Sequence, residues 1–562
     1  MDSCEADGHV RDRISIDVQA PMTKLSGGEA LVKSLLANGV ETIFGLPGGQ
    51  TYHFFDAVQK EGNALALFNA RHEQGAAYMA YGYARSTGKV GVYCVVPGPG
   101  VLNTTAALAT AYGNNTPVLC ITGQIPSAAI GRGIGYLHEI PDQLGILQRL
   151  TQWAERVPHP SLAPQLVNEA FTRLNSGRPR PVALEMAPDM MELRCDVELV
   201  GTVSAPTPPS ADPQLIERAA AILGKARRPL IMIGGGAVDA GAELLELAQM
   251  LQAPVVSFWN ARGIVDDRHF LSMSYPAGHR LWADADAVLA VGTRLKFPLM
   301  YWGCDDALPI IRIDIDPAEI GRIATPTVGI NADARTALKQ LISVVDRRGN
   351  RRPSREQELR AFKAALRVEM QGTIGPHLDI LDVIRQELPD DGFLVDEITQ
   401  VGYASWYAFP AYSARHFVSS GYQGNLGYGY ATALGVQIGN PGKKVVALGG
   451  DGGFMYAVQE MATAVRYGLN LVAIVFNNHS YGNVKRDQIE KFGGRVIGSD
   501  LTNPDFVKLA ESFGAAGYRC ETPAQLATAL KDAFDQRGPA LIEMPLGEMP
   551  NPWQYISLPR CR

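Results

Sequence analysis

A glycine-flanked aspartate and a pair of asparagines form the strongest candidate for a chemical site in this chain of 562 residues. Gly450-Asp451-Gly452-Gly453 follows the apolar run 445–448, and Asn477-Asn478 follows the apolar run 471–476. If both runs are strands of a parallel α/β sheet, both polar groups lie at carboxyl ends of strands, where ligands bind. A carboxylate, an amide oxygen and a backbone carbonyl suit Mg²⁺ that holds a diphosphate, and glycines let backbone N–H groups approach phosphate oxygens. A lone Gly-Asp-Gly is also an ordinary turn, so the prediction depends on the spacing to the asparagine pair.

Glu73 is a second candidate, because it opens a segment with the pattern of a tightly packed helix. Ala76, Ala77 and Ala80 are small residues at helical spacing. The helix dipole favours an anion in the first turn. Stabilisation of the helix start is therefore the better interpretation for an isolated glutamate at this position.

The order of these segments resembles the thiamine diphosphate-dependent enzymes of the acetohydroxyacid synthase, benzoylformate decarboxylase and pyruvate oxidase group. The resemblance runs from about residue 24 to about residue 550. It is specific for the cofactor and far less specific for the substrate. The matching segments are Gly45-Leu46-Pro47-Gly48, Glu73, Pro97-Gly98-Pro99-Gly100, Thr122-Gly123-Gln124, Gly424-Asn425-Leu426-Gly427-Tyr428-Gly429, Gly450-Asp451-Gly452 and Asn477-Asn478.

The resemblance implies a role for each matching residue. Glu73 would hydrogen-bond the aminopyrimidine ring of thiamine diphosphate and so promote removal of the thiazolium C2 proton. Asp451, Asn478 and the Ser480 carbonyl would ligate Mg²⁺. Leu426 would support the bent cofactor, although a lone leucine is equally well a core residue. The other expected cofactor contacts are Gly48, Thr399, Gln400, Gly424, Gly450, Gly452, Gly453, Tyr481 and Gly482.

The expected substrate pocket departs from the best-known members of the group. Segment 135–139 has one histidine, His138, where pyruvate decarboxylases carry adjacent histidines and acetohydroxyacid synthases carry Phe-Gln-Glu. His138 is a candidate proton relay, with Gln124 as a further catalytic candidate and Gln50 as a polar pocket residue. A polar loop histidine without a catalytic role is an equally good interpretation. The departure predicts a pocket that is not tuned to acetolactate formation.

These residues predict an enzyme, but the reaction stays open. The first hypothesis is an acetolactate-synthase-like carboligase and decarboxylase acting on a 2-oxoacid or a related carbonyl donor. The alternative is a non-ligating decarboxylase, a C–C hydrolase or lyase, or an acyl-CoA lyase with the same cofactor. A binding protein with a relic fold is disfavoured, because Glu73, Asp451 and Asn478 are all retained.

Helical segments that alternate with short β-rich runs predict an α/β fold with three doubly wound parallel-sheet domains. We expect a flexible segment at 1–23, a pyrimidine-binding domain at 24–195, a central domain at 210–345 and a diphosphate-binding domain at 370–562. Proline-rich and charged stretches at 200–213 and 346–358 are predicted linkers. In the resembled group the central domain binds FAD, ADP or nothing. The glycine turns of the central domain in this sequence do not distinguish between these three possibilities.

The overall composition and charge of the chain limit the classes of partner that it can bind. The net charge of −6 does not indicate binding to nucleic acid or to an anionic membrane. No apolar run reaches the length of a membrane-spanning helix. Seven scattered cysteines without C-x-x-C pairs predict reduced thiols in the cytoplasm. The expected partners are small-molecule carbonyl substrates. The resemblance also implies a homotetramer built as a dimer of dimers, in which Glu73 of one subunit meets the diphosphate site of another.

Overall fold

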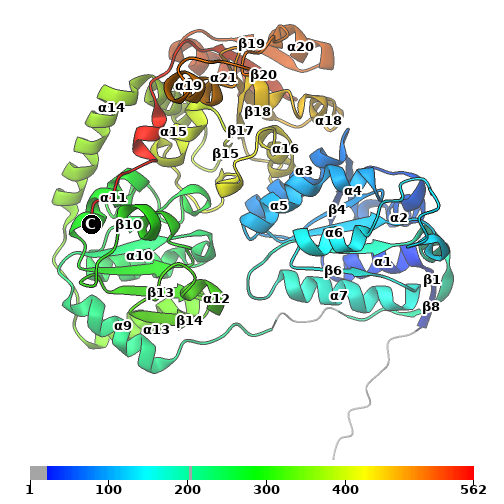
Figure 1. The fold of residues 1–562 in the computed structure, drawn as a ribbon, viewed down its shortest axis with the longest axis horizontal. Helices are drawn as coiled ribbons and strands as arrows, with labels where there is room; N and C mark the ends of the chain where they lie inside the picture. The colour runs from blue at the N-terminus through cyan, green and yellow to red at the C-terminus, as the bar shows by residue number, and fades with distance from the viewer. Residues whose placement is uncertain (1–21, 202–205) are drawn as a thin grey trace, which may run out of the picture.

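Three six-stranded sheets organise the part of the chain that the computed structural model describes, residues 22–201 and 206–562 (Figure 1). Every strand pairing within these three sheets is parallel. The predicted α/β class with three parallel-sheet domains is therefore confirmed. The flexible segment expected at 1–23 lies almost entirely outside the described residues.

The first and third sheets have the same topology. Their strand orders are β3-β2-β4-β5-β7-β6 and β16-β15-β17-β18-β20-β19, which both become 2-1-3-4-6-5 when each sheet is numbered along the chain. The strands of the first sheet are β2 (Thr42–Gly45), β3 (Ala66–Asn69), β4 (Gly91–Val95), β5 (Val118–Gly123), β6 (Trp153–Arg156) and β7 (Val182–Met186). Those of the third are β15 (Phe393–Val395), β16 (Phe417–Val418), β17 (Val445–Gly450), β18 (Leu471–Asn477), β19 (Ala516–Arg519) and β20 (Ala540–Pro545).

Both faces of the first sheet are covered by buried apolar side chains. In β4, Val92 and Cys94 belong to one hydrophobic cluster, whereas Tyr93 and Val95 belong to another. Successive side chains of a strand point to opposite faces, so the sheet lies between two apolar layers, as in doubly wound folds. The helices around this sheet include α1 (Gly27–Ala37), α2 (Tyr52–Lys60), α3 (Glu73–Thr87), α5 (Thr105–Gly113), α6 (Gln143–Leu150) and α7 (Ala163–Leu174).

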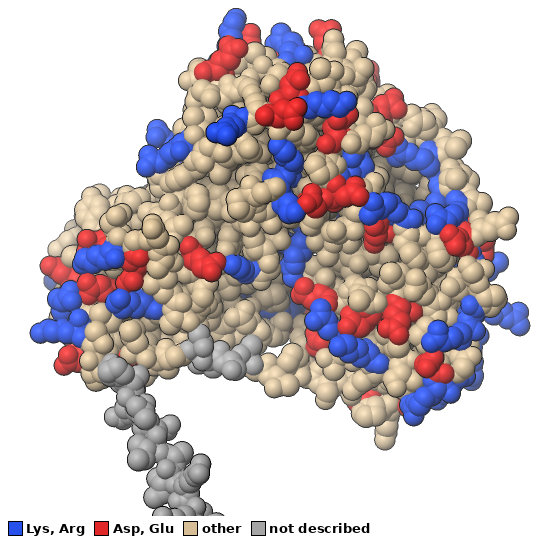
Figure 2. All heavy atoms as spheres, turned by 180° about the vertical axis from the view of Figure 1, so that it is seen from behind, with Lys and Arg blue, Asp and Glu red and all other residues tan. Residues whose placement is uncertain are grey.

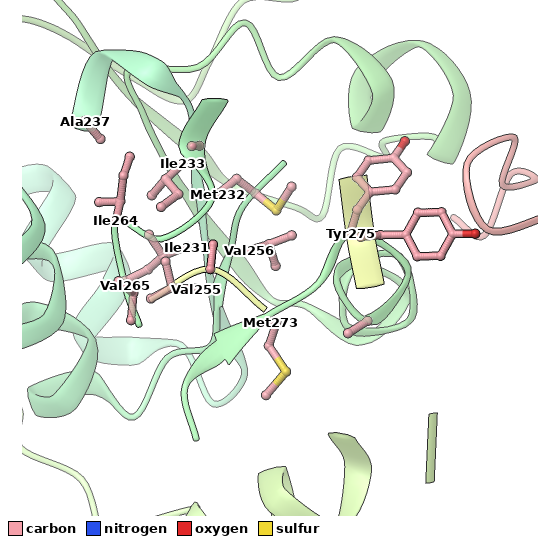
Figure 3. Close-up of a cluster of buried hydrophobic side chains, with 14 of the residues drawn as sticks. Ile231, Met232, Ile233, Ala237, Val255, Val256, Ile264, Val265, Met273 and Tyr275 are labelled. Carbon is pink, nitrogen blue, oxygen red and sulfur yellow. The ribbon is translucent and has the colours of Figure 1, made fainter. Parts of the chain in front are cut away.

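The central sheet has a different order, β11-β10-β9-β12-β13-β14. Numbered along the chain this is 3-2-1-4-5-6, the order of dinucleotide-binding folds. Its strands are β9 (Pro229–Ile233), β10 (Val255–Val256), β11 (Ser272–Met273), β12 (Ala287–Val291), β13 (Ile310–Asp314) and β14 (Val328–Asn331). Figure 3 shows part of its core, where Ile231 of β9, Val255 of β10 and Met273 of β11 gather with their neighbours.

Helices α3 and α16 (Gly429–Gly439) join the first and third domains along a close interface (Figure 1). A Cβ atom on Gly82 of α3 would lie 2.0 Å from the carbonyl oxygen of Thr432. A Cβ atom on Gly435 of α16 would lie 1.9 Å from the carbonyl oxygen of Met79. Only glycine permits this backbone approach, so the two glycines set the spacing between the first and third domains.

Two elements differ from the sequence-based expectations. An antiparallel ribbon pairs β1 (Met22–Ser26) with β8 (Arg194–Glu198), at the two ends of the first domain. The predicted linker 346–358 is helical at both ends, because α13 (Ala334–Arg347) continues into it and α14 (Glu356–Glu387) begins within it. Ion pairs at helical spacing, such as Arg355 with Glu358 and Arg360 with Glu356, explain how so charged a segment forms a helix start.

Charged side chains of both signs are interspersed on the face drawn in Figure 2, and neither sign gathers into one large patch. Within residues 22–201 and 206–562, none of the helices combines the length and apolar character needed to span a membrane.

Candidate cofactor site

A cavity of about 230 Å³ opens at the carboxyl ends of β15, β17 and β18. It lies where ligands bind in open α/β sheets. All of the expected cofactor contacts except Gly48 line it. These residues are Thr399, Gln400, Gly424, Leu426, Gly450, Asp451, Gly452, Gly453, Asn478, Ser480, Tyr481 and Gly482.

Asp451 is the only carboxylate among the residues that line this cavity. It begins α17 (Asp451–Phe454) directly after β17 and is 2% exposed. Burial raises the pKa of its carboxyl group, and no Lys, Arg or His among the described residues forms an ion pair with it. Its Oδ2 accepts a 2.7 Å hydrogen bond from Asn503, which also donates to Asn477. A buried carboxylate that forms no ion pair with the described residues is a suitable ligand for a hard divalent cation.

Asn478 and Ser480 lie beside Asp451 at the turn after β18. The Asn478 side-chain oxygen accepts from the Ser480 backbone N–H at 3.2 Å. A Cβ atom on Gly482 would lie 2.6 Å from the Asn478 amide nitrogen, and one on Gly452 would lie 2.4 Å from the Tyr481 ring. The glycines are therefore needed for close packing around the cavity. One carboxylate and two neutral oxygens fit an Mg²⁺ ion whose other ligands come from a diphosphate.

Two buried carboxyl groups support the cavity from the interior. Glu397 is 1% exposed, and its oxygens accept from the backbone N–H groups of Gly427 and Gly429 at 2.6 and 3.2 Å. Neighbouring Asp396 accepts from the Trp406 ring N–H and the Tyr428 hydroxyl. Burial raises the pKa of Asp396 to about 7 and that of Glu397 to about 8. The Glu397 carboxyl group thus holds in place the loop that carries Gly424 and Leu426. The sequence analysis did not predict this role of Glu397.

Thr399 and Gln400 start α15 (Gln400–Ala408) at the cavity edge. The Thr399 hydroxyl oxygen caps this helix by accepting from the Gly402 N–H at 3.0 Å. The Gln400 side chain accepts from Arg486 of α19 (Gly482–Lys491) at 3.2 Å. Arg486 and Asn503 are further residues that the sequence did not single out, because each reaches the site from a different element of the third domain.

The candidate residues of the first domain do not line this cavity. Glu73 is the first residue of α3 and is half-buried, and its Oε2 accepts from Asn103 at 3.0 Å. The His138 ring nitrogen Nδ1 lies 3.0 Å from the side-chain oxygen of Gln50, and the Gln50 amide donates to the Leu137 carbonyl. The structure therefore brings Gln50 and His138 together. Gly48 lies nearby, at the turn before Gln50, where its N–H donates to Thr51.

Gln124 is placed differently from the other first-domain candidates. It is buried, its amide nitrogen donates to Glu185 at 3.2 Å, and its amide oxygen accepts from the Ile125 N–H. Both ends of the side chain are thus used inside the domain. This geometry favours a structural role for Gln124.

A larger cavity of about 570 Å³ lies at the carboxyl ends of β9, β12 and β13, against segments of the first and third domains. Gly234 and Gly292 meet there so closely that a Cβ on Gly234 would lie 2.3 Å from the Gly292 carbonyl oxygen. Arg294 lines the same cavity and lies 4.9 Å from the Tyr422 ring centroid. Ser257 and Trp259 also line it, although the Ser257 hydroxyl and the Trp259 ring N–H are themselves buried and have no hydrogen-bond partner. The cavity is thus lined by glycine turns and one arginine of the central domain.

Comparisons with known proteins agree with this geometry. Residues 25–146 match the N-terminal TPP binding domain of thiamine pyrophosphate enzymes, 216–341 match the central domain, and 397–544 match the C-terminal TPP binding domain. A probable 2-ketoarginine decarboxylase of Pseudomonas aeruginosa is 34% identical, with 93% of this chain and 94% of that protein covered. The acetolactate synthase large subunit of Haemophilus influenzae is 32% identical over 91% of this chain and 93% of its own length. The acetolactate synthase isozyme 3 large subunit of Escherichia coli is 30% identical, with 92% of this chain and 93% of that protein covered. The chain therefore belongs to the thiamine pyrophosphate-dependent enzymes, in the group that includes acetohydroxyacid synthase, benzoylformate decarboxylase and pyruvate oxidase.

Proposed function

We propose that this enzyme uses thiamine diphosphate and Mg²⁺ to decarboxylate a 2-oxoacid, and to ligate the product to an acceptor in an acetolactate-synthase-like reaction. The observation that carries the proposal is the 230 Å³ cavity at one sheet edge, lined by Asp451, Asn478, Gly424 and Leu426 together. The alternative is cleavage without ligation, by a non-ligating decarboxylase, a C–C hydrolase or lyase, or an acyl-CoA lyase.

The residues of the third domain would bind the cofactor. Asp451, Asn478 and the Ser480 carbonyl would ligate Mg²⁺, and the glycines at 450–453 would admit the diphosphate. Leu426, at the cavity wall, would support the bent form of the cofactor. When bound, thiamine diphosphate supplies the carbanion chemistry at its thiazolium ring.

Glu73 would exchange a proton with the aminopyrimidine ring nitrogen. It lies outside the cavity of its own chain, in a different domain, so we propose that it serves the cavity of a second copy. The surface near His138, in the domain that carries Glu73, and the surface near the cavity of the third domain are both suited to such an interface. Exposed apolar side chains lie on each of these two surfaces. Near His138 these are Ile134, Tyr136 and Leu137, and on α19 and the segment that follows it they are Val484, Ile489, Phe492 and Ile497. We propose a homotetramer built from two such dimers.

The pocket composition supports a donor larger or more polar than pyruvate. His138 lies in the loop where acetohydroxyacid synthases carry Phe-Gln-Glu, and it forms a polar pair with Gln50 from the turn after β2. The relative named as a probable 2-ketoarginine decarboxylase is consistent with a polar 2-oxoacid. The cysteines within the described residues are all free, which supports a reducing compartment such as the cytoplasm.

A screen of 2-oxoacids with and without acceptor aldehydes tests this function, with CO₂ release and ligated product measured separately. Pyruvate and a guanidino-bearing 2-oxoacid should be the reference donors. We expect CO₂ release from the polar donor and weak acetolactate formation from pyruvate. Strong acetolactate synthesis would contradict the proposed donor preference, and absence of CO₂ release from every donor would contradict decarboxylation.

The 570 Å³ cavity supports a second proposal, an adenine nucleotide such as ADP, or FAD, bound to the central domain. Its support is the 3-2-1-4-5-6 strand order together with the cavity lining that Gly234, Gly292 and Arg294 provide. Calorimetry with ADP and FAD tests the proposal. Binding that is weakened by Arg294→Ala is expected, and lack of binding of both nucleotides would contradict it.

A further inference from the structure

Glu460 crosses from the third domain to the start of the helix that carries Glu73. It ends the short turn η9 (Val458–Glu460) and is completely buried, at 0% exposure. Its Oε1 accepts from the backbone N–H groups of Arg71 and His72 at 3.1 and 3.0 Å. Its Oε2 accepts from the Arg71 N–H at 3.2 Å and from the Thr463 hydroxyl at 2.7 Å. All of these contacts use the carboxylate as an acceptor.

These contacts determine the first turn of α3. Arg71 and His72 directly precede Glu73, and their N–H groups point out of the helix start, where an anion is favoured. The His72 ring Nδ1 accepts from the Gln74 N–H at 3.1 Å and completes the cap. The backbone that positions Glu73 is therefore held by a side chain from another domain.

Gly75 shows how closely Glu460 approaches this helix. A Cβ atom on Gly75 would lie 2.3 Å from Oε1 of Glu460, which is far inside van der Waals contact. Any other residue at position 75 would displace the carboxylate. The fit between Gly75 and Glu460 leaves little freedom for the start of α3.

Glu460 is itself fixed by a rigid segment. The chain runs from Asp451 through α17 to Glu460, and Phe454 within it is buried against Tyr430 and Phe506, at ring distances of 5.1 and 6.2 Å. Met461, directly after Glu460, is also buried. The segment can therefore transmit the position of the third domain to the first turn of α3.

We propose that Glu460 is a positioning residue for Glu73, which it holds at the correct place for proton exchange with the cofactor. This inference rests on the proposed function, because it assigns Glu460 a role in the activation step that Glu73 performs. Glu460 itself does not line the cofactor cavity.

The test compares Glu460→Gln, Glu73→Gln and the double variant in the holoenzyme with thiamine diphosphate and Mg²⁺. A glutamine would turn an NH₂ group toward backbone N–H donors and lose part of the cap. Misplacement of a reacting group by 1 Å can cost about 10²-fold. We expect Glu460→Gln to slow cofactor C2–H exchange by at least about 10-fold, with cofactor affinity from calorimetry changed less than about 2-fold.

The double variant separates positioning from a general structural effect. If Glu460 acts through Glu73, Glu460→Gln should change the exchange rate little once Glu73 is already glutamine. An equal fall in both backgrounds, or unchanged exchange in the single variant, would overturn the inference. Unchanged exchange in Glu73→Gln would instead contradict the proposed function.

Two further variants guard against misfolding. Glu319→Gln alters another buried carboxylate, 4% exposed, in the central domain, which pairs with Arg178 at 2.8 Å, and should leave exchange unchanged. Thr463→Val removes only the hydroxyl contact to Oε2. It should slow exchange by a smaller factor than Glu460→Gln, and if Glu460→Gln does not fold, normal exchange in Thr463→Val would overturn the inference.

Discussion

An oxygen of the Glu397 carboxyl group lies 2.6 Å from the backbone nitrogen of Gly427, so a buried acidic side chain holds the loop below the candidate cofactor site in place. Burial raises the pKa of Glu397 from 4.5 to about 8 and that of adjacent Asp396 from 3.8 to about 7. The folded enzyme therefore binds more protons at these groups than the unfolded chain does.

This relationship predicts the pH dependence of stability. Because the folded pKa of Glu397 is raised, the stability that protonation provides is present below pH 4.5 and is lost as the pH rises toward about 8. Glu397→Gln removes one titrating group and should flatten the fall in the free energy of unfolding across this window. Urea unfolding of the cofactor-free parent and variant at several pH values measures this free energy. If the free energy of unfolding fell with pH equally steeply in both proteins, the raised pKa of Glu397 would be contradicted.

His138 is predicted to act on substrate and not on the cofactor. His138→Ala should lower kcat on the best substrate by about 10²-fold, the lower range for general acid–base steps, with cofactor affinity nearly unchanged. His53→Ala is the matched control, since the His53 side chain is 43% exposed and only approaches Glu192 at 3.9 Å. Full turnover in His138→Ala would show that this histidine is only a polar loop residue.

Assembly should depend on the exposed apolar residues of both proposed contact surfaces. Leu137 and Ile497 are 69% and 81% exposed, so a charge at either position should leave the fold intact. Leu137→Asp and Ile497→Asp should shift sedimentation toward monomer and lower activity together. Val368→Asp, on α14 and 73% exposed, is the control that should change neither. A fully active monomer of the parent protein would contradict a site shared between two copies.

The cofactor loops could be predicted from the sequence because their residues directly follow continuous apolar strands. Asp451 follows β17 and Asn478 follows β18, so strand pattern and glycine chemistry locate both at one sheet edge. The contacts made by Glu460 and Asn503 could not be predicted in this way. Each depends on tertiary packing that brings distant segments together, and an isolated glutamate or asparagine carries no periodic signal.

Glu73 is predicted to be the residue that activates the cofactor. Glu73→Gln keeps the shape of the side chain and its place at the start of α3 but cannot exchange the proton. C2–H exchange of bound thiamine diphosphate should fall by about 10²–10⁴-fold. Thermal unfolding should stay close to that of the parent, and an exchange rate as fast as in the parent would reject the role.

The most direct test of the account is calorimetric titration of Asp451→Ala with thiamine diphosphate in the presence and absence of Mg²⁺. Loss of an outer-shell partner typically costs about 10–100-fold in metal affinity. We therefore expect Asn503→Ala, which removes the 2.7 Å contact to Asp451, to weaken binding by about that factor and Asp451→Ala to abolish Mg²⁺-dependent binding. Asp505→Ala, at an exposed helix cap nearby, should bind like the parent. Mg²⁺-dependent binding of parent affinity in Asp451→Ala would contradict the assignment of this cavity as the cofactor site.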